Sequence, residues 1–429
     1  MPSNNKIIGT TSQKDLVQMY MDYVSKYKAE FFDNLGLGVV QGQREKLMIR
    51  MLEGSREGES PLELIDCHTS GGVFNLGHHH PLINRALIEG LEAGLDIGDH
   101  HLLSEQRALL AKQMANLFPG DICKTMFSVG GGEAIDLAIK LSRAFTKKKK
   151  IISANRAYHG VTGFALGACA SSFKEPFLWS LPDFQQVPFG DIEQLKNIID
   201  EETACVLFET IPATGGILIP PEGYFAEVRE LCDEIGAVMI ADEVQTGLGR
   251  TGQLWGIYGG LYPNEKIVPD MIVLAKGMSA GVYPLSTTSY KPKFEEVFED
   301  DPFLHISTTG GSELGCYVTR KMLDIISQPT FLENIRTQGT KFGKGLIELQ
   351  EEYSEKIIDV RGRGLMWGIE FTDEFTSLYF TLSMIKNGVF CDYCGNQKVT
   401  NKFLPPLIVQ SHDIEEILLR VKRTLEQLN

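Results

Sequence analysis

The sequence has no long hydrophobic run. No stretch of its 429 residues reaches the roughly 18 continuous apolar residues that a membrane-spanning helix needs. The residues after Met1 are polar and do not form the apolar segment of a secretory signal. We therefore expect neither a membrane partner nor secretion.

An excess of positive charge is also missing. The chain has 41 Lys and Arg residues against 56 Asp and Glu residues, which gives a net charge of −15. Proteins that bind nucleic-acid phosphates usually present a basic face. The basic run at residues 147–150 is expected to be a solvated helix end. The charge balance therefore argues against a nucleic-acid partner.

The cysteines show no disulfide framework, because they are scattered and several lie inside apolar runs. This pattern indicates reduced, buried thiols and a cytoplasmic protein. Cys391 and Cys394 form a lone C-x-x-C pair, which is weak support for zinc or redox chemistry without a second pair. We expect no metal site. The eight cysteines are Cys67, Cys123, Cys169, Cys205, Cys232, Cys316, Cys391 and Cys394.

The length predicts two or three domains, and the composition (43% hydrophobic, 23% charged) is that of a globular protein. The middle of the chain alternates short apolar strands with helical patterns, which predicts an α/β domain with a mostly parallel sheet covered on both faces. From about Leu323 onward, long helices surround shorter strand-like pieces, as in a small α+β domain. The expected strands are 125–129, 150–153, 205–209, 237–241, 271–275 and 365–371; the expected helices are 16–32, 133–145, 192–199, 224–235, 331–352 and 414–428.

A glycine turn follows the first expected strand of the large domain and opens a helix. Gly130, Gly131 and Gly132 lie at this junction, where unpaired backbone N–H groups and the helix dipole favour an anion. A tight turn with no ligand is equally consistent with the pattern. The turn is neither a P-loop, which needs Lys-Ser or Lys-Thr, nor a dinucleotide fingerprint, whose third glycine is absent.

Two further strand ends carry charge. Asp242 and Glu243 follow one apolar strand, and Lys276 follows another. Buried charges are costly unless they are paired, so a salt bridge from Lys276 to either carboxylate is one interpretation. The other is that the amine is used covalently. A phosphate site, a carboxylate for a ring nitrogen and a Schiff-base lysine together suit pyridoxal phosphate.

With these features and the motifs given below, the chain resembles the class III pyridoxal-phosphate aminotransferases, the group of ornithine, acetylornithine and 4-aminobutyrate aminotransferases. The motifs occur in the family's order over about residues 60–410, and the stretch from Asp242 to Gly252 is highly specific. They are 72–81 (GVFNLGHHHP), 131–134 (GGEA), 158–160 (YHG), Glu209, 241–252 (ADEVQTGLGRTG), 269–270 (PD), 276–277 (KG), 308–311 (TTGG), 361–365 (RGRGL) and 405–407 (PPL).

The resemblance implies the PLP-dependent transferase fold (fold type I): a large domain with a mostly parallel seven-stranded sheet, and a small α+β C-terminal domain. The implied divisions are an N-terminal segment at 1–64 that packs with the small domain, a large domain at 65–322 and a small domain at 323–429. It also implies a ping-pong aminotransferase, which moves an amino group from an amine or amino acid to a 2-oxo acid or aldehyde.

The resemblance further assigns catalytic roles. Lys276 would form the Schiff base with pyridoxal 5′-phosphate and then move the proton between the substrate Cα and C4′ of the cofactor. Asp242 would pair with the pyridinium nitrogen. His159 is expected to support Tyr158 and its loop. The run His78–His80 is expected to be structural, since adjacent histidines in an extended segment do not converge on one ion.

The remaining expected cofactor contacts surround the ring and the phosphate. Val244 and Tyr158 would sandwich the ring, Gln245 would bond its phenolic oxygen, and the backbone N–H groups of Gly131 and Gly132 would hold the phosphate. Thr308 would reach that phosphate from the neighbouring subunit, so the resemblance implies a homodimer with its active site at the subunit interface.

The chain departs from the family at the carboxylate-binding positions. Lys402 stands where an arginine is usual, three residues before the Pro-Pro pair, and lysine cannot make the bidentate fork. Glu209 keeps the first acid of the family's E-P-x-x-x-E motif, whereas Thr214 replaces the second. We expect Lys402 and Glu209 to contact substrate, and a donor that is not simply ornithine or 4-aminobutyrate.

Three alternatives to aminotransfer remain open on the sequence. A racemase or epimerase, or a decarboxylase, of the same family would keep Lys276 and Asp242. A non-enzymatic binding module is disfavoured because both of these residues are present. A nucleotide-binding α/β protein lacks its motifs.

Overall fold

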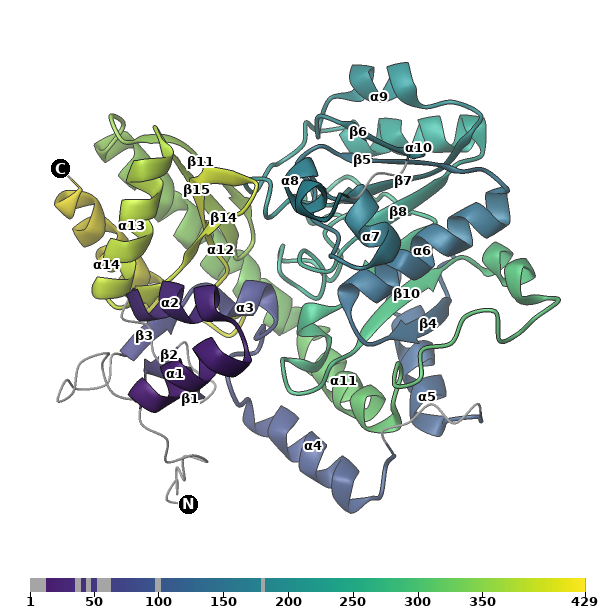
Figure 1. The fold of residues 1–429 in the computed structure, drawn as a ribbon, viewed down its shortest axis with the longest axis horizontal. Helices are drawn as coiled ribbons and strands as arrows, with labels where there is room; N and C mark the ends of the chain where they lie inside the picture. The colour runs from purple at the N-terminus through teal and green to yellow at the C-terminus, as the bar shows by residue number, and fades with distance from the viewer. Residues whose placement is uncertain are drawn as a thin grey trace.

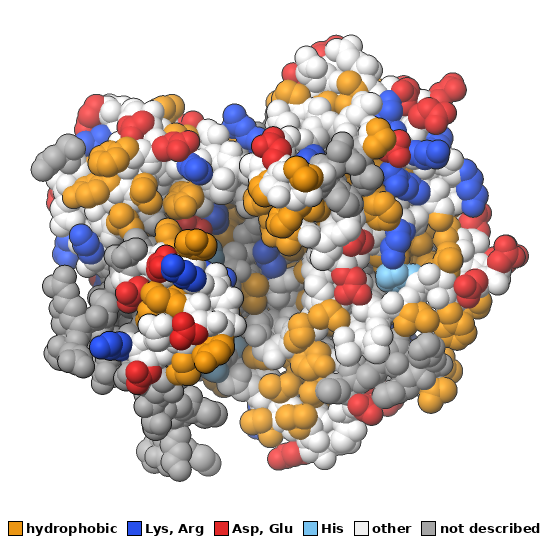
Figure 2. All heavy atoms as spheres, viewed as in Figure 1, with side chains coloured by type: hydrophobic (Ala, Val, Ile, Leu, Met, Phe, Trp, Pro, Cys, Tyr) orange, Lys and Arg blue, Asp and Glu red, His pale blue; other side chains and the backbone are white. Residues whose placement is uncertain are grey.

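The computed structural model describes residues 13–34, 40–43, 48–51, 63–96, 102–178 and 182–428. A large and a small domain lie side by side (Figure 1), and the front surface is hollowed between them (Figure 2). No helix within these residues is long and apolar enough to cross a membrane.

A seven-stranded sheet forms the centre of the large domain, in the order β4-β10-β9-β8-β7-β5-β6. β10 alone runs opposite to the other strands, so the sheet is mostly parallel, as predicted. The strands are β4 (Lys124–Ser128), β5 (Lys150–Ala154), β6 (Phe184–Val187), β7 (Thr203–Glu209), β8 (Val238–Asp242), β9 (Met271–Leu274) and β10 (Ser286–Tyr290).

Alternate side chains of the buried strands enter two different cores. Leu207 and Val273 pack on one face of the sheet, and Val206 and Ile272 pack on the other. Each fully buried side chain of this kind contributes about 1.5–3 kcal/mol, so both faces hold the sheet together. One face is covered by α6 (Gly131–Thr146) and α7 (Gly163–Ala168), the other by α4 (Pro81–Glu92), α5 (Glu105–Ala115), α9 (Ile192–Ile198), α10 (Tyr224–Ile235) and α11 (Glu313–Ile326).

The small domain packs three helices on an antiparallel sheet in the order β11-β12-β15-β14. Its core includes Phe342 and Leu346 of the long helix and Phe403 of the sheet. The elements are α12 (Pro329–Glu352), β11 (Ile357–Arg363), β12 (Met366–Phe371), α13 (Glu374–Lys386), β13 (Val389–Phe390), β14 (Asp392–Cys394), β15 (Gln397–Phe403) and α14 (Ser411–Gln427).

The N-terminal part joins the small domain through a separate sheet, β1-β2-β3-β13. β3 pairs parallel with β13, and Ile65 and Cys67 enter the core of the small domain. The stretch expected as one helix at 16–32 is two helices. The N-terminal elements are α1 (Gln13–Tyr23), α2 (Lys26–Asn34), β1 (Val40–Gln43), β2 (Met48–Met51) and β3 (Glu63–Asp66).

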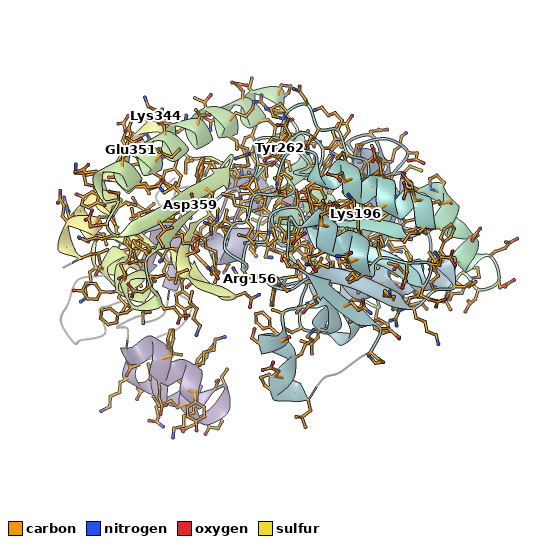
Figure 3. All side chains as sticks on the ribbon, turned by 90° about the horizontal axis from the view of Figure 1, so that it is seen from above. Arg156, Lys196, Tyr262, Lys344, Glu351 and Asp359 are labelled. Atoms are coloured by element: carbon orange, nitrogen blue, oxygen red, sulfur yellow. The ribbon has the colours of Figure 1, made fainter. Side chains whose placement is uncertain are left out.

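Side chains also link the two domains directly. Arg250 is fully buried, and its Nη1 donates to the carbonyl oxygen of Leu365 at 3.0 Å. Arg363 lies over the ring of Tyr262, 5.2 Å from its centroid, and Figure 3 shows Tyr262 between α12 and the large domain. The shorter elements are α3 (Thr69–Gly72), α8 (Ser171–Lys174), η1 (Glu175–Phe177), η2 (Lys276–Ser279) and η3 (Pro292–Phe298).

Candidate active site

The strands β4, β7, β8 and β9 end at the same edge of the sheet. Glu209 and Asp242 lie directly beside each other in register at the ends of β7 and β8. Ligands of open α/β sheets bind outside this edge. A cavity of about 510 Å³ opens here, and its lining includes Gly131, Gly132, Tyr158, Glu209, Asp242, Val244, Gln245 and Lys276.

Lys276 lies just beyond β9 and begins the short helix η2, with a backbone φ of 44°. Burial lowers the pKa of its amine, and the charge of Lys402 lowers it further, while Asp242 and Glu209 oppose this shift. Desolvation disfavours the charged form of an amine. The chain therefore places a nucleophilic amine of lowered pKa at the cavity.

The carboxylate of Asp242 is held on two sides. His159 Nδ1 lies 2.7 Å from Asp242 Oδ2, and the Val244 backbone N–H donates to Asp242 Oδ1 at 3.0 Å. Both side chains of this His–Asp pair are almost fully buried, at 0% and 4% exposed. A salt bridge from Lys276 to Asp242 or Glu243, one of the two interpretations of these strand ends, is not among the ion pairs of the described residues. Glu243 instead accepts hydrogen bonds from its own loop and from Thr210.

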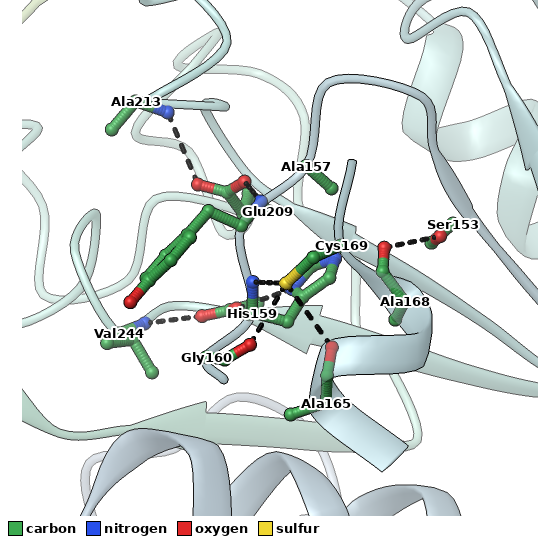
Figure 4. A network of polar contacts seen from close by, with 12 residues as sticks. Ser153, Ala157, His159, Gly160, Ala165, Ala168, Cys169, Glu209, Ala213 and Val244 are labelled. Atoms are coloured by element: carbon green, nitrogen blue, oxygen red, sulfur yellow. Dashed lines mark hydrogen bonds and ion pairs between the residues drawn. The ribbon is translucent and has the colours of Figure 1, made fainter. Parts of the chain in front are cut away.

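Glu209 is a second buried carboxylate, next to Asp242. It accepts hydrogen bonds from the backbone N–H groups of Tyr158 at 2.9 Å and Ala213 at 3.2 Å (Figure 4). Burial raises the pKa of Glu209 to about 7; His159 opposes the shift and the charge of Asp242 adds to it. Glu209 therefore holds a proton more readily than an exposed glutamate, and it lies beside the group that we expect to serve the cofactor ring.

Three residues around the Tyr-His-Gly motif form a bonded unit at the cavity. The His159 backbone N–H donates to Cys169 Sγ at 3.2 Å, and that thiol donates to the Gly160 carbonyl oxygen at 3.0 Å (Figure 4). Burial raises the pKa of the Cys169 thiol to about 11, so it is not a nucleophile at neutral pH. Cys169 fixes the loop that carries Tyr158 and His159.

The glycine turn leads from β4 into α6 and leaves space for an anion. Gly130 is the N-cap of α6, and a side-chain carbon added to it would meet nothing within 4 Å. At Gly132 such a carbon would lie 2.7 Å from Thr162 Oγ1. The 16-residue helix α6 presents its unpaired N-terminal N–H groups to this space.

Gln245 reaches the other wall of the cavity, where its Nε2 donates to the Gly71 carbonyl oxygen at 2.6 Å. Residues 69–72 all have positive φ. A side-chain carbon at Gly71 would lie 3.6 Å from Lys276 Cε. This left-handed turn, costly for Thr69 and Ser70, thus brings the N-terminal part of the chain against Lys276.

These features fit pyridoxal phosphate. The cavity has an open glycine turn at a helix N-terminus for a phosphate. It also has an amine of lowered pKa for an aldehyde, and a carboxylate at the neighbouring strand end for a ring nitrogen. Val244 and Tyr158 also line it and are available to contact the two faces of a ring.

The predicted residues outside this group lie in two places. Thr308 is exposed and does not line the cavity. Lys402 lies on β15 with its side chain 8% exposed, and its charge acts on Lys276. The Thr214 carbonyl oxygen accepts a hydrogen bond from the Asn396 backbone N–H at 2.9 Å. Thr214 and Lys402, the two departures at the family's carboxylate-binding positions, thus both lie at the β14–β15 hairpin.

The histidine run and the C-x-x-C pair lie in structural positions away from the cavity lining. His78 Nε2 lies 2.8 Å from Asp66 Oδ2, and His80 is the N-cap residue of α4. Cys391 and Cys394 are fully buried, and burial raises the pKa of both thiols. In the part of the chain that the structure describes, no three His, Cys, Asp or Glu residues converge on a metal-binding position.

Two residues of the site were not identified from sequence in the roles that they have here. His159 was expected to support Tyr158, but its ring contacts Asp242 directly; the Tyr-His-Gly motif was the available signal. Asp392 on β14 forms an ion pair with Lys402 on the neighbouring strand β15. No motif marks Asp392, because the pairing depends on the register of β14 and β15.

Replacement of Gly160 by alanine is expected to weaken cofactor binding by at least about tenfold, or about 1.4 kcal/mol. Gly160 has φ +116°, and a side-chain carbon there would lie 2.6 Å from Gly132 Cα, so the phosphate turn would be displaced. Equilibrium titration with pyridoxal phosphate measures the effect. Gly223→Ala is the matched control, because Gly223 also has a positive φ (+87°) but does not line the cavity, and its added carbon meets nothing within 4 Å; equal losses in both variants would contradict the role of Gly160.

Comparison with known proteins agrees with this geometry. Residues 55–425 match the family model of class III aminotransferases. An uncharacterized aminotransferase of Archaeoglobus fulgidus is 46% identical over 418 residues, covering 97% of this chain and 95% of the relative.

Solved structures share the fold. A transaminase from the marine bacterium Virgibacillus superposes with a TM-score of 0.86 at 24% identity, covering 97% of this chain and all of the other. The ornithine aminotransferase of Toxoplasma gondii gives a TM-score of 0.84 at 23% identity, covering 97% and 95%. These likenesses confirm the fold type I architecture. The chain belongs to the class III aminotransferases and is a pyridoxal-phosphate-dependent enzyme of that family.

Proposed function

We propose that Lys276 carries the cofactor and moves the proton, and that Asp242 with His159 holds the ring nitrogen. The observation that supports this assignment is the position of a lysine of lowered pKa at the end of β9, one strand away from a carboxylate backed by a histidine at 2.7 Å. Gly131, Gly132, Tyr158, Val244 and Gln245 are the proposed cofactor contacts.

Pyridoxal phosphate, when bound, supplies an aldehyde that takes up the substrate nitrogen and a ring that withdraws electrons from the substrate Cα. Lys276 Nζ, whose pKa is lowered by desolvation, takes the proton from Cα of the donor and delivers a proton to C4′ of the cofactor. Asp242 keeps the ring nitrogen protonated, and His159 keeps the Asp242 carboxylate oriented. Glu209 adds a proton-exchanging group near this pair.

The second substrate is proposed to be a 2-oxo acid whose carboxylate is attracted by the positive charge of Lys402. An arginine would hold that carboxylate in a planar fork, whereas lysine offers a compact charge. We therefore propose a donor that is not simply ornithine or 4-aminobutyrate. Efficient transfer from the δ-amine of ornithine would contradict this proposal.

We also propose a homodimer in which Thr308 completes the phosphate site of the neighbouring subunit. Thr308 is exposed and does not contribute to the cavity of its own chain. It follows an exposed apolar segment that includes Leu304, 57% exposed, and Ile306, 42% exposed. Burial of such side chains favours association. The eight free cysteines support a cytoplasmic location.

Borohydride reduction of the cofactor-loaded protein is expected to attach the cofactor irreversibly to Lys276, because reduction converts the imine to a stable amine. Peptide mass spectrometry locates the adduct. Lys174 is the matched control, since burial also lowers the pKa of its amine. The adduct is expected to persist in Lys174→Ala and to disappear in Lys276→Ala; an adduct on any other lysine would overturn the assignment.

A further inference from the structure

A second cavity, of about 850 Å³, lies between the helix α12 and the loop that follows β8. The turn between β11 and β12 completes its wall, and Figure 3 shows Lys344 and Glu351 along α12 with Tyr262 beside that helix. It shares no lining residue with the cavity at Lys276. Its volume is within the usual range of small-molecule sites.

The guanidinium of Arg363 is fixed in the wall of this cavity. Its Nε donates to the Leu261 carbonyl oxygen at 2.8 Å, and its Nη1 donates to the Gly362 carbonyl oxygen at 2.9 Å. Its Cζ lies 5.2 Å from the centroid of the Tyr262 ring, a distance at which a ring attracts a cation. The two hydrogen bonds use two of the five N–H donors of a guanidinium, so three donors remain for a ligand.

Arg363 has no carboxylate partner among the described residues, although its side chain is half-buried. The other two cations of the lining have one. Arg336 Nη2 lies 2.5 Å from Glu333 Oε2, and Lys344 Nζ lies 3.8 Å from Glu348 Oε1. A partly buried charge is costly unless it is paired. The charge of Arg363 is therefore the one in this lining that an incoming anion can balance.

The two aromatic side chains of the lining have no spare polar atom. Trp367 Nε1 donates to the Gly364 carbonyl oxygen at 2.7 Å, and the Tyr262 hydroxyl donates to the Pro220 carbonyl oxygen at 2.8 Å. Their rings therefore offer apolar surface to the cavity, together with Ile347 of α12, which is 42% exposed. Apolar walls around a few placed polar groups are typical of sites for small organic ligands.

The charges of the lining favour one carboxylate over a phosphate. A guanidinium binds either group through two parallel N–H bonds. A phosphate brings more negative charge than the single free cation balances, and Glu351, which also lines the cavity, would repel it. A carboxylate matches the charge of Arg363 and leaves the rest of the ligand free to be apolar.

We propose that this cavity is a second ligand site of the enzyme and that it binds a small aromatic carboxylate. The carboxylate lies on the guanidinium of Arg363, and the flat ring lies against the rings of Trp367 and Tyr262. Because these side chains come from the β11–β12 hairpin and from the loop after β8, the ligand contacts both domains. The site is separate from the substrate site and does not depend on the proposed transfer of nitrogen.

Calorimetry of the cofactor-loaded protein with 2-naphthoate tests the proposal. Naphthalene-2-carboxamide has the same rings without the charge, and inorganic phosphate has charge without the rings. Arg363→Gln removes the fixed cation, and Arg363→Lys keeps the charge but loses the paired N–H bonds. Lys344→Gln is the matched control, since it removes a cation of the same cavity that is 78% exposed and already paired. Lys402→Gln reports binding at the substrate site instead.

We expect one 2-naphthoate per chain, with binding at least about tenfold weaker in Arg363→Gln and about 3- to 10-fold weaker in Arg363→Lys. The carboxamide and phosphate should bind the wild type at least about tenfold more weakly than 2-naphthoate. Lys344→Gln and Lys402→Gln should bind 2-naphthoate like the wild type. Ile347→Trp fills the cavity from an exposed position on α12, so it should abolish binding and leave turnover unchanged, which separates lost binding from misfolding.

Other results would overturn the proposal. Equal binding by Arg363→Gln and the wild type would exclude the guanidinium. An equal loss in Lys344→Gln would mean that only the general charge of this surface attracts the ligand, and a loss in Lys402→Gln would place the ligand in the substrate site. Tighter binding of phosphate than of 2-naphthoate would contradict the ligand class, and absence of binding to the wild type at about 10 mM would exclude the site.

Discussion

Replacement of Lys276 by alanine slows both half-reactions by about 10⁴-fold in our expectation, the upper end of what a positioned acid–base group supplies. Lys276 is the amine of lowered pKa at the end of β9 that faces the cavity. Among the described residues, no other lysine lines this cavity to carry the proton between Cα and C4′. In the variant, water would have to move the proton without a fixed position.

The measurement is stopped-flow absorbance of Lys276→Ala supplied with pyridoxal phosphate and an amine donor. The phosphate cradle and Asp242 are intact in this variant, so cofactor binding should persist while turnover is lost. Added methylamine should restore part of the rate, because it replaces the missing amine. Lys174→Ala should react at the wild-type rate. A normal rate in Lys276→Ala would remove this residue from the mechanism.

Replacement of Asp242 by asparagine is expected to slow the proton-transfer step by about 10³-fold, equivalent to about 4 kcal/mol. Asparagine keeps the shape of the side chain but loses the charge that, in our proposal, stabilises a protonated ring nitrogen. His159 Nδ1, 2.7 Å from the carboxylate, would also lose its charged partner. The electron-withdrawing power of the ring would fall accordingly.

The pH dependence of the cofactor absorbance distinguishes this effect from unfolding. In Asp242→Asn the ring nitrogen should release its proton at lower pH than in the wild type, because the compensating negative charge is gone. Glu243→Gln is the matched control. Glu243 is the next residue and is equally buried, but it accepts hydrogen bonds from Thr210, Thr246, Gly256 and Ile257 rather than facing the cavity. It should lose stability and keep the wild-type spectrum.

The sequence predicted the fold wherever apolar residues mark a strand. The strands β4, β5, β7, β8 and β9 begin and end within two residues of the positions predicted from their apolar runs. β10 was not predicted, because each of its residues Ser286–Tyr290 carries a hydroxyl group. These hydroxyls are buried, and some bond to backbone, as Ser286 Oγ does to the Gly130 carbonyl oxygen at 2.9 Å. Buried polar side chains of this kind do not produce the run or alternation of apolar residues from which a strand is predicted.

The site was predictable where its polar and charged residues directly follow an apolar strand. Lys276, Asp242 and the glycine turn each follow an apolar strand, and parallel strands bring such ends together. The partners of these groups were not predictable. His159 reaches Asp242 from 83 residues away, and the Lys402–Asp392 pair depends on the register between β14 and β15. Such contacts follow from tertiary packing rather than from local pattern.

The pairing of β3 with β13 has a consequence for biosynthesis. Thr69 Oγ1, just beyond β3, donates to the carbonyl oxygen of Leu404, 335 residues later in the chain. At usual translation speeds the ribosome needs roughly 20–70 s to make this interval. During that time Thr69 lacks this partner, and contacts this distant in sequence form slowly. The turn at 69–72, which lies next to Lys276, is thus among the last parts of the enzyme to be secured, after the large domain can already have folded around its sheet.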